Sequence, residues 1–108
     1  MIKAIYCTSA ILILFSFVAS TQAATITVTQ QNKQFVPTTL RIKVGDSVNF
    51  MNEDPFYHNV FSLSDTKSFD LGSYPKGQFK TVKFDKAGKV EVECSIHPDM
   101  HLEIDVVR

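Results

Sequence analysis

Apolar and polar residues alternate with a period of two along most of the chain after residue 24. The clearest runs place Val90, Val92 and Cys94 on one face of a segment, and Leu102 and Ile104 on one face of the last. Successive side chains of a strand point to opposite faces, so each run predicts a strand with one buried face. Further runs of this kind occur at 25–29, 39–44, 48–50, 61–63, 82–84 and, in a loop-rich stretch, 69–71.

Turn residues separate these runs, and no stretch shows the 3.6-residue period of a helix. About seven or eight short strands at such close spacing predict an all-β sandwich or barrel. The chain has no internal repeat and no low-complexity linker. We therefore expect one domain, spanning residues 24–108.

The first 23 residues follow a different pattern. Lys3 gives a positive start, an apolar stretch runs from Ala10 to Ala19, and small and polar residues follow to Ala23. This is the three-part layout of a secretory signal peptide, and we expect cleavage after Ala23 and export to the periplasm. An uncleaved membrane anchor is the alternative, but the apolar run is about half of the ~20 residues that a spanning helix needs.

Charge excludes one class of partner. Residues 24–108 carry ten Lys or Arg and eleven Asp or Glu, which are interspersed and form no basic stripe. A nucleic-acid partner is therefore not expected.

The cysteines point towards a metal. The sequence has two, but Cys7 lies in the predicted signal peptide, so the mature chain keeps Cys94 alone and has no intrachain disulfide. Small secreted domains are usually stabilised by disulfides, and a bound metal ion is the other common source of added stability. A single thiol in an oxidising compartment can oxidise or cross-link, so it is expected to be buried or bound to a metal.

Three candidate metal ligands lie within seven residues, with the spacing C-x2-H-x2-M. The alternation places Cys94 at the end of a strand with its thiol on the core face, and the short turn lets His97 return towards the sulfur. Pro98 stiffens this turn because its ring fixes φ. Met100 opens the next strand on its apolar side. One loop thus offers thiolate, imidazole and thioether to a common point.

The fourth ligand has to come from elsewhere, and His58 is the candidate. It follows the strand at 48–50, whose end can lie beside the end of the strand at 90–94. Two histidines, one cysteine and a weak axial methionine form the ligand set of a type 1 copper site, whereas structural zinc gains little from a thioether. Taken singly, Cys94 and Met100 could be core residues and His58 a surface residue.

His101 also neighbours Met100, but parity argues against it as a ligand. Met100 shares the parity of the inward residues Leu102 and Ile104, so His101 belongs with Glu103 on the solvent side.

The sequence resembles the plastocyanin, pseudoazurin and amicyanin group of cupredoxins, and its short C-x2-H-x2-M loop is most similar to that of amicyanin. The resemblance covers nearly all of the mature chain. The stretches that carry it are 35–37 with Leu40, 44–50, 58–60, 84–88 and the loop from Cys94 to Met100.

The resemblance implies a Greek-key β-sandwich with one copper ion bound by His58, Cys94, His97 and Met100. It also implies one-electron transfer between partner proteins through the exposed edge of His97, framed by Ile96 and Pro98. Asn59 matches the family residue that ties the two ligand loops together, here through Ser95. Leu102 departs from the family pattern, which often has glycine at that position, and this departure bears on the axial distance of Met100.

We therefore expect a monomeric electron-transfer protein rather than an enzyme, with transient redox partners near His97. Two other functions use the same sequence features. A copper carrier or chaperone could use the same four ligands without redox turnover. A secreted β-sandwich binding module would use no metal at all.

Overall fold

The computed structural model describes residue 4 and residues 8–16 and 22–108, and all of its strands lie between Thr25 and Val107. Lys3, Cys7 and Ala19 of the predicted signal peptide lie outside the described residues, as do the other residues of 1–3, 5–7 and 17–21. Within the described part of the chain, no helix has the length and apolar character needed to span a membrane.

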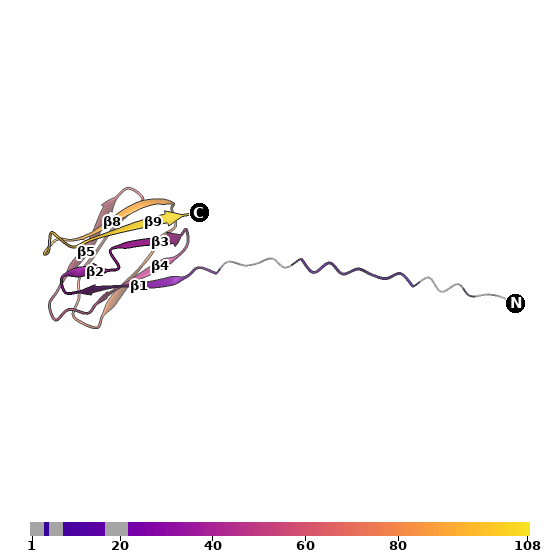
Figure 1. The fold of residues 1–108 in the computed structure, drawn as a ribbon, viewed down its shortest axis with the longest axis horizontal. Coiled ribbons are helices and arrows are strands. Elements are labelled where there is room, and N and C mark those ends of the chain that lie inside the picture. Colours follow the sequence, from indigo (N-terminus) through magenta and orange to yellow (C-terminus); the bar gives the residue numbers. More distant parts are fainter. Residues whose placement is uncertain (1–3, 5–7, 17–21) are drawn as a thin grey trace.

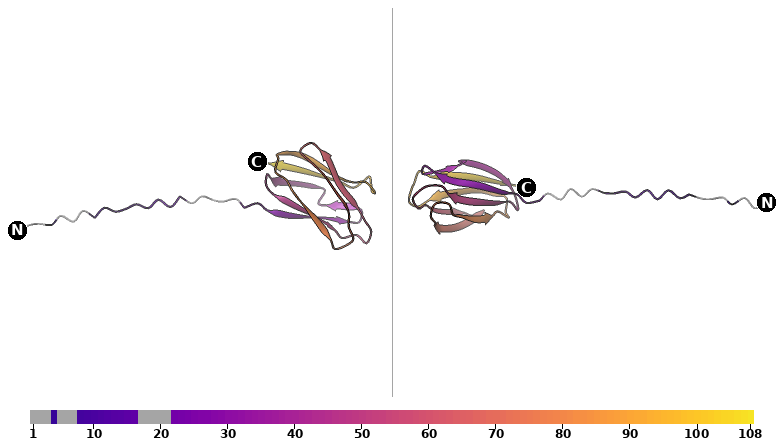
Figure 2. Two further views of the ribbon diagram at one scale, coloured as in Figure 1. Left: turned by 180° about the vertical axis from the view of Figure 1, so that it is seen from behind. Right: turned by 90° about the horizontal axis from the view of Figure 1, so that it is seen from below.

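The described residues form nine strands arranged as a two-layered sandwich (Figures 1 and 2). The strands are β1 (Thr25–Gln31), β2 (Gln34–Val36), β3 (Thr39–Lys43), β4 (Ser47–Asn52), β5 (Asn59–Ser64), β6 (Lys67–Ser73), β7 (Phe79–Lys83), β8 (Gly88–Cys94) and β9 (His101–Val107). The predicted all-β sandwich is confirmed. The pattern missed β2, which has three residues and is too short to show alternation, and it placed β6 in a loop-rich stretch.

The two sheets have the strand orders β2-β1-β4-β7 and β3-β9-β8-β5-β6. The neighbours β1 and β4 are parallel, as are β3 and β9, and the remaining pairs are antiparallel. Figure 1 shows the loop from β8 to β9 at one end of the sandwich, opposite to the end that holds the C-terminus and the start of β1.

The core between the sheets is built from the inward faces that alternation predicts for β8 and β9. Val90, Val92 and Leu102 are fully buried, and Cys94 is 3% exposed. The core cluster consists of Val28, Phe35, Ile42, Val48, Phe50, Val60, Val82, Phe84, Val90, Val92, Cys94, Met100, Leu102, Ile104 and Val106. This core fixes the strand ends from which the site is built.

The apolar pattern is misleading at β5. Val60 and Ser62 point inward there, whereas Leu63 is 77% exposed. A register shift between Asn59 and Phe61 interrupts the pairing of β5 with β6. The Ser62 hydroxyl donates to the backbone carbonyl of Lys67, so its burial is compensated.

Candidate metal centre

Strand pairing brings His58 to Cys94. His58 immediately precedes β5, which pairs with β8 so that Val60 lies opposite Cys94. The strand at 47–52, whose end the sequence argument set beside the end of the strand at 90–94, lies in the other sheet of the sandwich. The chain leaves that sheet at Asn52 and crosses to the second sheet before His58, so the two residues meet through β5.

A short turn returns His97 to the same point. The backbone amide of Met100 donates to the carbonyl of His97 at 3.0 Å, which closes the turn. The first residue of the loop is tied to Asn59, since the Ser95 hydroxyl donates to Asn59 Oδ1 at 3.0 Å and its amide donates to the Asn59 carbonyl at 3.2 Å. The expected link between the two ligand loops through Asn59 and Ser95 is confirmed.

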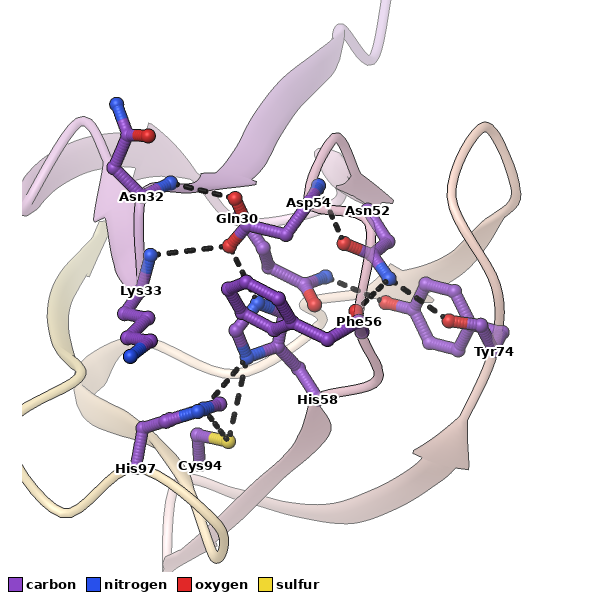
Figure 3. A network of polar contacts seen from close by, with 10 residues as sticks. All are labelled: Gln30, Asn32, Lys33, Asn52, Asp54, Phe56, His58, Tyr74, Cys94 and His97. Atoms are coloured by element: carbon purple, nitrogen blue, oxygen red, sulfur yellow. Dashed lines mark hydrogen bonds and ion pairs between the residues drawn. The ribbon is translucent and has the colours of Figure 1, made fainter.

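Three donor atoms converge at the site (Figure 3). The Nδ1 atoms of His58 and His97 are 3.0 Å apart, and each lies 3.8 Å from Cys94 Sγ. The point equidistant from these three atoms lies about 2.1 Å from each. Bonds from zinc, a typical small metal ion, are about 2.0–2.1 Å long to histidine nitrogen and about 2.3 Å long to cysteine sulfur. The three donors therefore fit one small metal ion.

Met100 and His101 lie on the two faces that the alternation predicted for them. Met100 is 1% exposed and belongs to the core cluster, directly before β9. His101 is exposed and lies opposite Glu93 on the neighbouring strand. The prediction that His101 faces solvent is thus confirmed, and Met100 is the thioether on the inner side of the loop.

A family model described as copper binding proteins of the plastocyanin/azurin family matches residues 22–107. The chain belongs to this family. It is an amicyanin-like cupredoxin.

Known proteins of several kinds are similar to this cupredoxin. The methylamine utilization protein MauL of Methylorubrum extorquens is 35% identical over 68 residues, which cover 62% of this chain and 60% of MauL. A reduced amicyanin mutant is 25% identical with a TM-score of 0.71, covering 82% of this chain and 87% of the mutant. A copper-containing nitrite reductase of Thermus scotoductus is 30% identical with a TM-score of 0.72, covering 77% of this chain but 22% of the reductase.

The donor set of this cupredoxin suits copper, its cofactor. The clustered His58, Cys94 and His97, together with Met100, would form a type 1 site, in which thiolate and thioether stabilise Cu(I) and imidazole binds both oxidation states. His58 and Cys94 are almost fully buried, whereas His97 is partly exposed. The centre therefore reaches the surface through one ligand.

Asp54 orients His58, and the sequence reasoning did not identify it. Its Oδ2 lies 2.7 Å from His58 Nε2, with both side chains buried (Figure 3). The carboxylate accepts a hydrogen bond from the Nε2–H group of His58, which keeps the proton on Nε2 and leaves the lone pair of Nδ1 facing Cys94 and His97. Carboxylates commonly fix the tautomer and ring orientation of a metal-binding histidine in this way.

The Asp54 carboxylate is itself anchored by the turn between β1 and β2. It accepts backbone hydrogen bonds from Asn32 at 2.7 Å and Lys33 at 3.0 Å, two residues with positive φ. Burial raises the pKa of Asp54, but the hydrogen bonds from Lys33, His58 and Asn32 outweigh this effect, and the pKa lies below its ordinary value. Asp54 is therefore a carboxylate at neutral pH.

A buried polar network extends from Asp54 into the sandwich (Figure 3). Asn52 accepts from the Asp54 amide and donates to the carbonyls of Phe56 and Tyr74. Gln30 donates to the Tyr74 hydroxyl, and burial, partly offset by this bond, raises the pKa of Tyr74 to about 12. Parity could have indicated part of this network, since Asn52 continues the inward face of Val48 and Phe50, and a buried amide needs partners.

The Phe56 ring packs beside both histidines, with centroid distances of 5.2 Å to His58 and 5.5 Å to His97. Partial burial lowers the pKa of His97, and the charges of His58 and Lys33 act in the same direction, whereas Asp54 opposes them. A lowered pKa favours the neutral imidazole, which is the form that binds a metal ion.

Proposed function

We propose that this cupredoxin carries single electrons between partner proteins, with copper bound by His58, Cys94, His97 and Met100. The observation that carries the proposal is the triangle of His58, His97 and Cys94 donor atoms, whose centre lies at metal-bond distance from all three. Copper supplies the redox chemistry when bound, since it accepts one electron as Cu(II) and releases it as Cu(I).

The protein's own residues supply a rigid ligand shell. His58 is held by Asp54, and the Cys94 loop is held by the Asn59–Ser95 contacts. Ligands fixed in this way move little when the charge of the metal changes, so reorganisation during electron transfer is small. Rigidity of this kind favours a carrier that exchanges electrons quickly and keeps its metal.

The electron path to partners runs through His97. This side chain is partly exposed at the surface, and beside it Ile96 is 52% exposed and Pro98 is also exposed. A small apolar surface around one ligand suits a weak and short-lived contact, as a carrier with two successive partners requires. We therefore place the transient contact of redox partners here, with the protein acting as a monomer.

A copper carrier or chaperone without redox turnover is the second candidate, because the same ligands would bind its cargo. The burial of His58 and Cys94 disfavours it, since a chelator or acceptor protein reaches such ligands slowly.

Export completes the proposal. The charged start, apolar stretch and small residues of 1–23 support a signal peptide that is removed to leave 24–108 as a periplasmic cupredoxin domain. An oxidising periplasm is compatible with a single buried Cys94 that is occupied by metal.

Electron exchange and metal release distinguish the two candidates. Copper-loaded protein is mixed in a stopped-flow instrument with a small inorganic reductant and then with a small inorganic oxidant, and separately with an excess of a copper chelator. An electron carrier is reduced and reoxidised within milliseconds to seconds and keeps its copper for hours. Slow reduction together with copper loss within minutes would favour the copper carrier.

A further inference from the structure

Among the described residues, Ala24 is the first that forms hydrogen bonds with the sandwich. Its carbonyl accepts a hydrogen bond from the Ser47 amide at 2.9 Å, and the parallel pairing of β1 with β4 then begins at Thr25 opposite Ser47. Gln22, Ala23 and Ala24 are all exposed. The first of these hydrogen bonds thus falls at the residue that the signal-peptide pattern predicts as the new N-terminus.

The backbone nitrogen of Ala24 has a carboxylate as its partner. It donates to Asp46 Oδ1 at 2.8 Å, and the second oxygen of Asp46 accepts from the Lys43 amide at 2.9 Å. Asp46 is 8% exposed. The backbone hydrogen bonds from Ala24 and Lys43, with a contribution from the Lys43 charge, outweigh desolvation and lower the pKa of Asp46 below its ordinary value.

The position of Asp46 is fixed by its backbone as well as by its side chain. Its amide donates to the Lys43 carbonyl at 3.0 Å, and its carbonyl accepts from the Phe84 amide at 2.9 Å. The preceding Gly45 has φ +99° and donates to the Phe84 carbonyl at 2.7 Å. The carboxylate is therefore held at the start of β1 and does not need to be ordered by its partner.

We propose that Asp46 is a binding site for the α-ammonium group of the mature chain, so that removal of residues 1–23 converts the Ala24 contact into an ion pair. This inference rests on the export part of the proposed function and not on copper. Hydrolysis of the Ala23–Ala24 peptide bond consumes one water, releases residues 1–23 with a carboxylate on Ala23, and leaves an NH3+ group on the Ala24 nitrogen. A hydrogen bond between two charged groups is roughly twice as strong as a neutral one. Processing therefore strengthens the start of the domain.

The other charges around this site oppose the ammonium. Arg41 and Lys43 line the same hollow as Asp46, and Lys83 lies opposite Ser47 on the neighbouring strand. Attraction by Asp46 has to exceed repulsion by these three cations. The 2.8 Å contact favours attraction, whereas the exposed lysine and arginine charges are screened by solvent.

The ion pair has a definite pH dependence. Asp46 raises the pKa of the α-amino group in the folded protein above its unfolded value of about 7.7–8.0. The added stability is fully present below that unfolded value and is lost as the pH rises through the folded pKa. Asp46 itself is ionised throughout this range, because its pKa lies below 3.8.

The test compares two starting points of the same domain, free of copper so that its result does not depend on metal binding. Residues 24–108 hold all nine strands and the whole core cluster, so one protein starts at Ala24 and a second keeps Ala23. Asp46→Asn is made in both, and Asp65→Asn, at an exposed turn residue, serves as the matched control. Thermal unfolding is followed from pH 6.5 to 10, and the α-amino pKa is measured by NMR.

We expect Asp46→Asn to lower the melting temperature more in the protein that starts at Ala24, with the difference disappearing by pH 10. The α-amino pKa of that protein is expected to exceed its unfolded value by about half a unit or more and to return towards it in Asp46→Asn. Equal losses in both proteins, or an α-amino pKa at the unfolded value, would overturn the ion pair. Mass spectrometry of the exported full chain should give Ala24 as the first residue, and another start would overturn the role of processing.

Discussion

Cys94 and His58 are positioned by the pairing of β5 with β8, whereas His97 and Met100 depend on a loop of a few residues. The loop is closed by the hydrogen bond from the Met100 amide to the His97 carbonyl. Asp54 adds the contact that decides which nitrogen of His58 faces the metal. We therefore expect Met100 to affect the reduction potential of the copper and Asp54 to affect the affinity for copper.

Met100 is expected to tune the reduction potential. A thioether favours Cu(I), so Met100→Gln, which offers a harder oxygen, should lower the potential while copper stays bound. Voltammetry of the copper-loaded protein measures this, and Met51→Gln, at a half-buried methionine of β4, is the control. An unchanged potential in Met100→Gln would show that Met100 is not the axial ligand and that Leu102 has altered the loop exit.

Asp54 is expected to control copper affinity. In Asp54→Asn one carboxylate oxygen becomes an NH2 group, so either the hydrogen bond from Asn32 or those from Lys33 and His58 are lost, and the negative charge beside His58 is removed. Loss of such a contact typically costs about 10–100-fold in metal affinity. Competition with a chelator measures this loss, with circular dichroism to verify folding. Asp99→Asn, at an exposed position of the copper loop, should leave the affinity unchanged, and equal affinities in both variants would refute an orienting role for Asp54.

At the scale of elements, the site joins three segments that are distant in sequence. The β1–β2 turn holds Asp54, the segment before β5 carries His58, and the β8–β9 loop carries the other ligands. The contact of Ser95 with Asn59 links the last two segments directly. The geometry of the centre therefore depends on all three segments and not on the β8–β9 loop alone.

Ser95→Ala removes the side-chain half of that link. A hydrogen bond contributes about 0.5–1.5 kcal/mol to stability, and this exposed one should fall at the lower end. Urea unfolding measures the loss, and copper release to a chelator should be faster in the variant. Ser68→Ala, an exposed serine in β6, is the control. Release at the parent rate in Ser95→Ala would mean that the backbone contact from Ser95 to Asn59 suffices.

Strands with a long and strict alternation could be predicted from sequence, and β8 and β9 have the expected buried faces. Local spacing likewise gave Cys94, His97 and Met100, because a short loop limits where its side chains can point. The pairing of β5 with β8 that brings His58 to Cys94 was not predicted, since pairing between distant segments leaves no local pattern. Asp54 was missed for the same reason, because its partners include backbone amides of the β1–β2 turn.

At the scale of the whole molecule, no disulfide restrains the described residues, whose single cysteine is Cys94. The two layers are held together by one core cluster, and the site joins the strand ends on one side of it. A ligand that binds the folded state alone stabilises it by mass action. Copper is therefore expected to contribute to folding stability as well as to redox chemistry.

Copper should raise the melting temperature of the protein. At a thousand times its dissociation constant, a ligand of the folded state adds about 4 kcal/mol, and each kcal/mol shifts the midpoint of a domain this size by roughly 4–8 °C. Calorimetry with and without copper should show an increase of more than about 10 °C. Equal melting temperatures would contradict a centre that spans three segments.

The absorption spectrum of the copper-loaded protein, recorded beside that of Cys94→Ser, tests the central claim most directly. A type 1 site absorbs strongly in the visible range because charge moves from the thiolate to Cu(II). The parent protein should therefore be intensely blue, and Cys94→Ser should lose the colour even where copper still binds to His58 and His97. A colourless parent, or a Cys94→Ser variant that stays blue, would contradict the assignment of this centre.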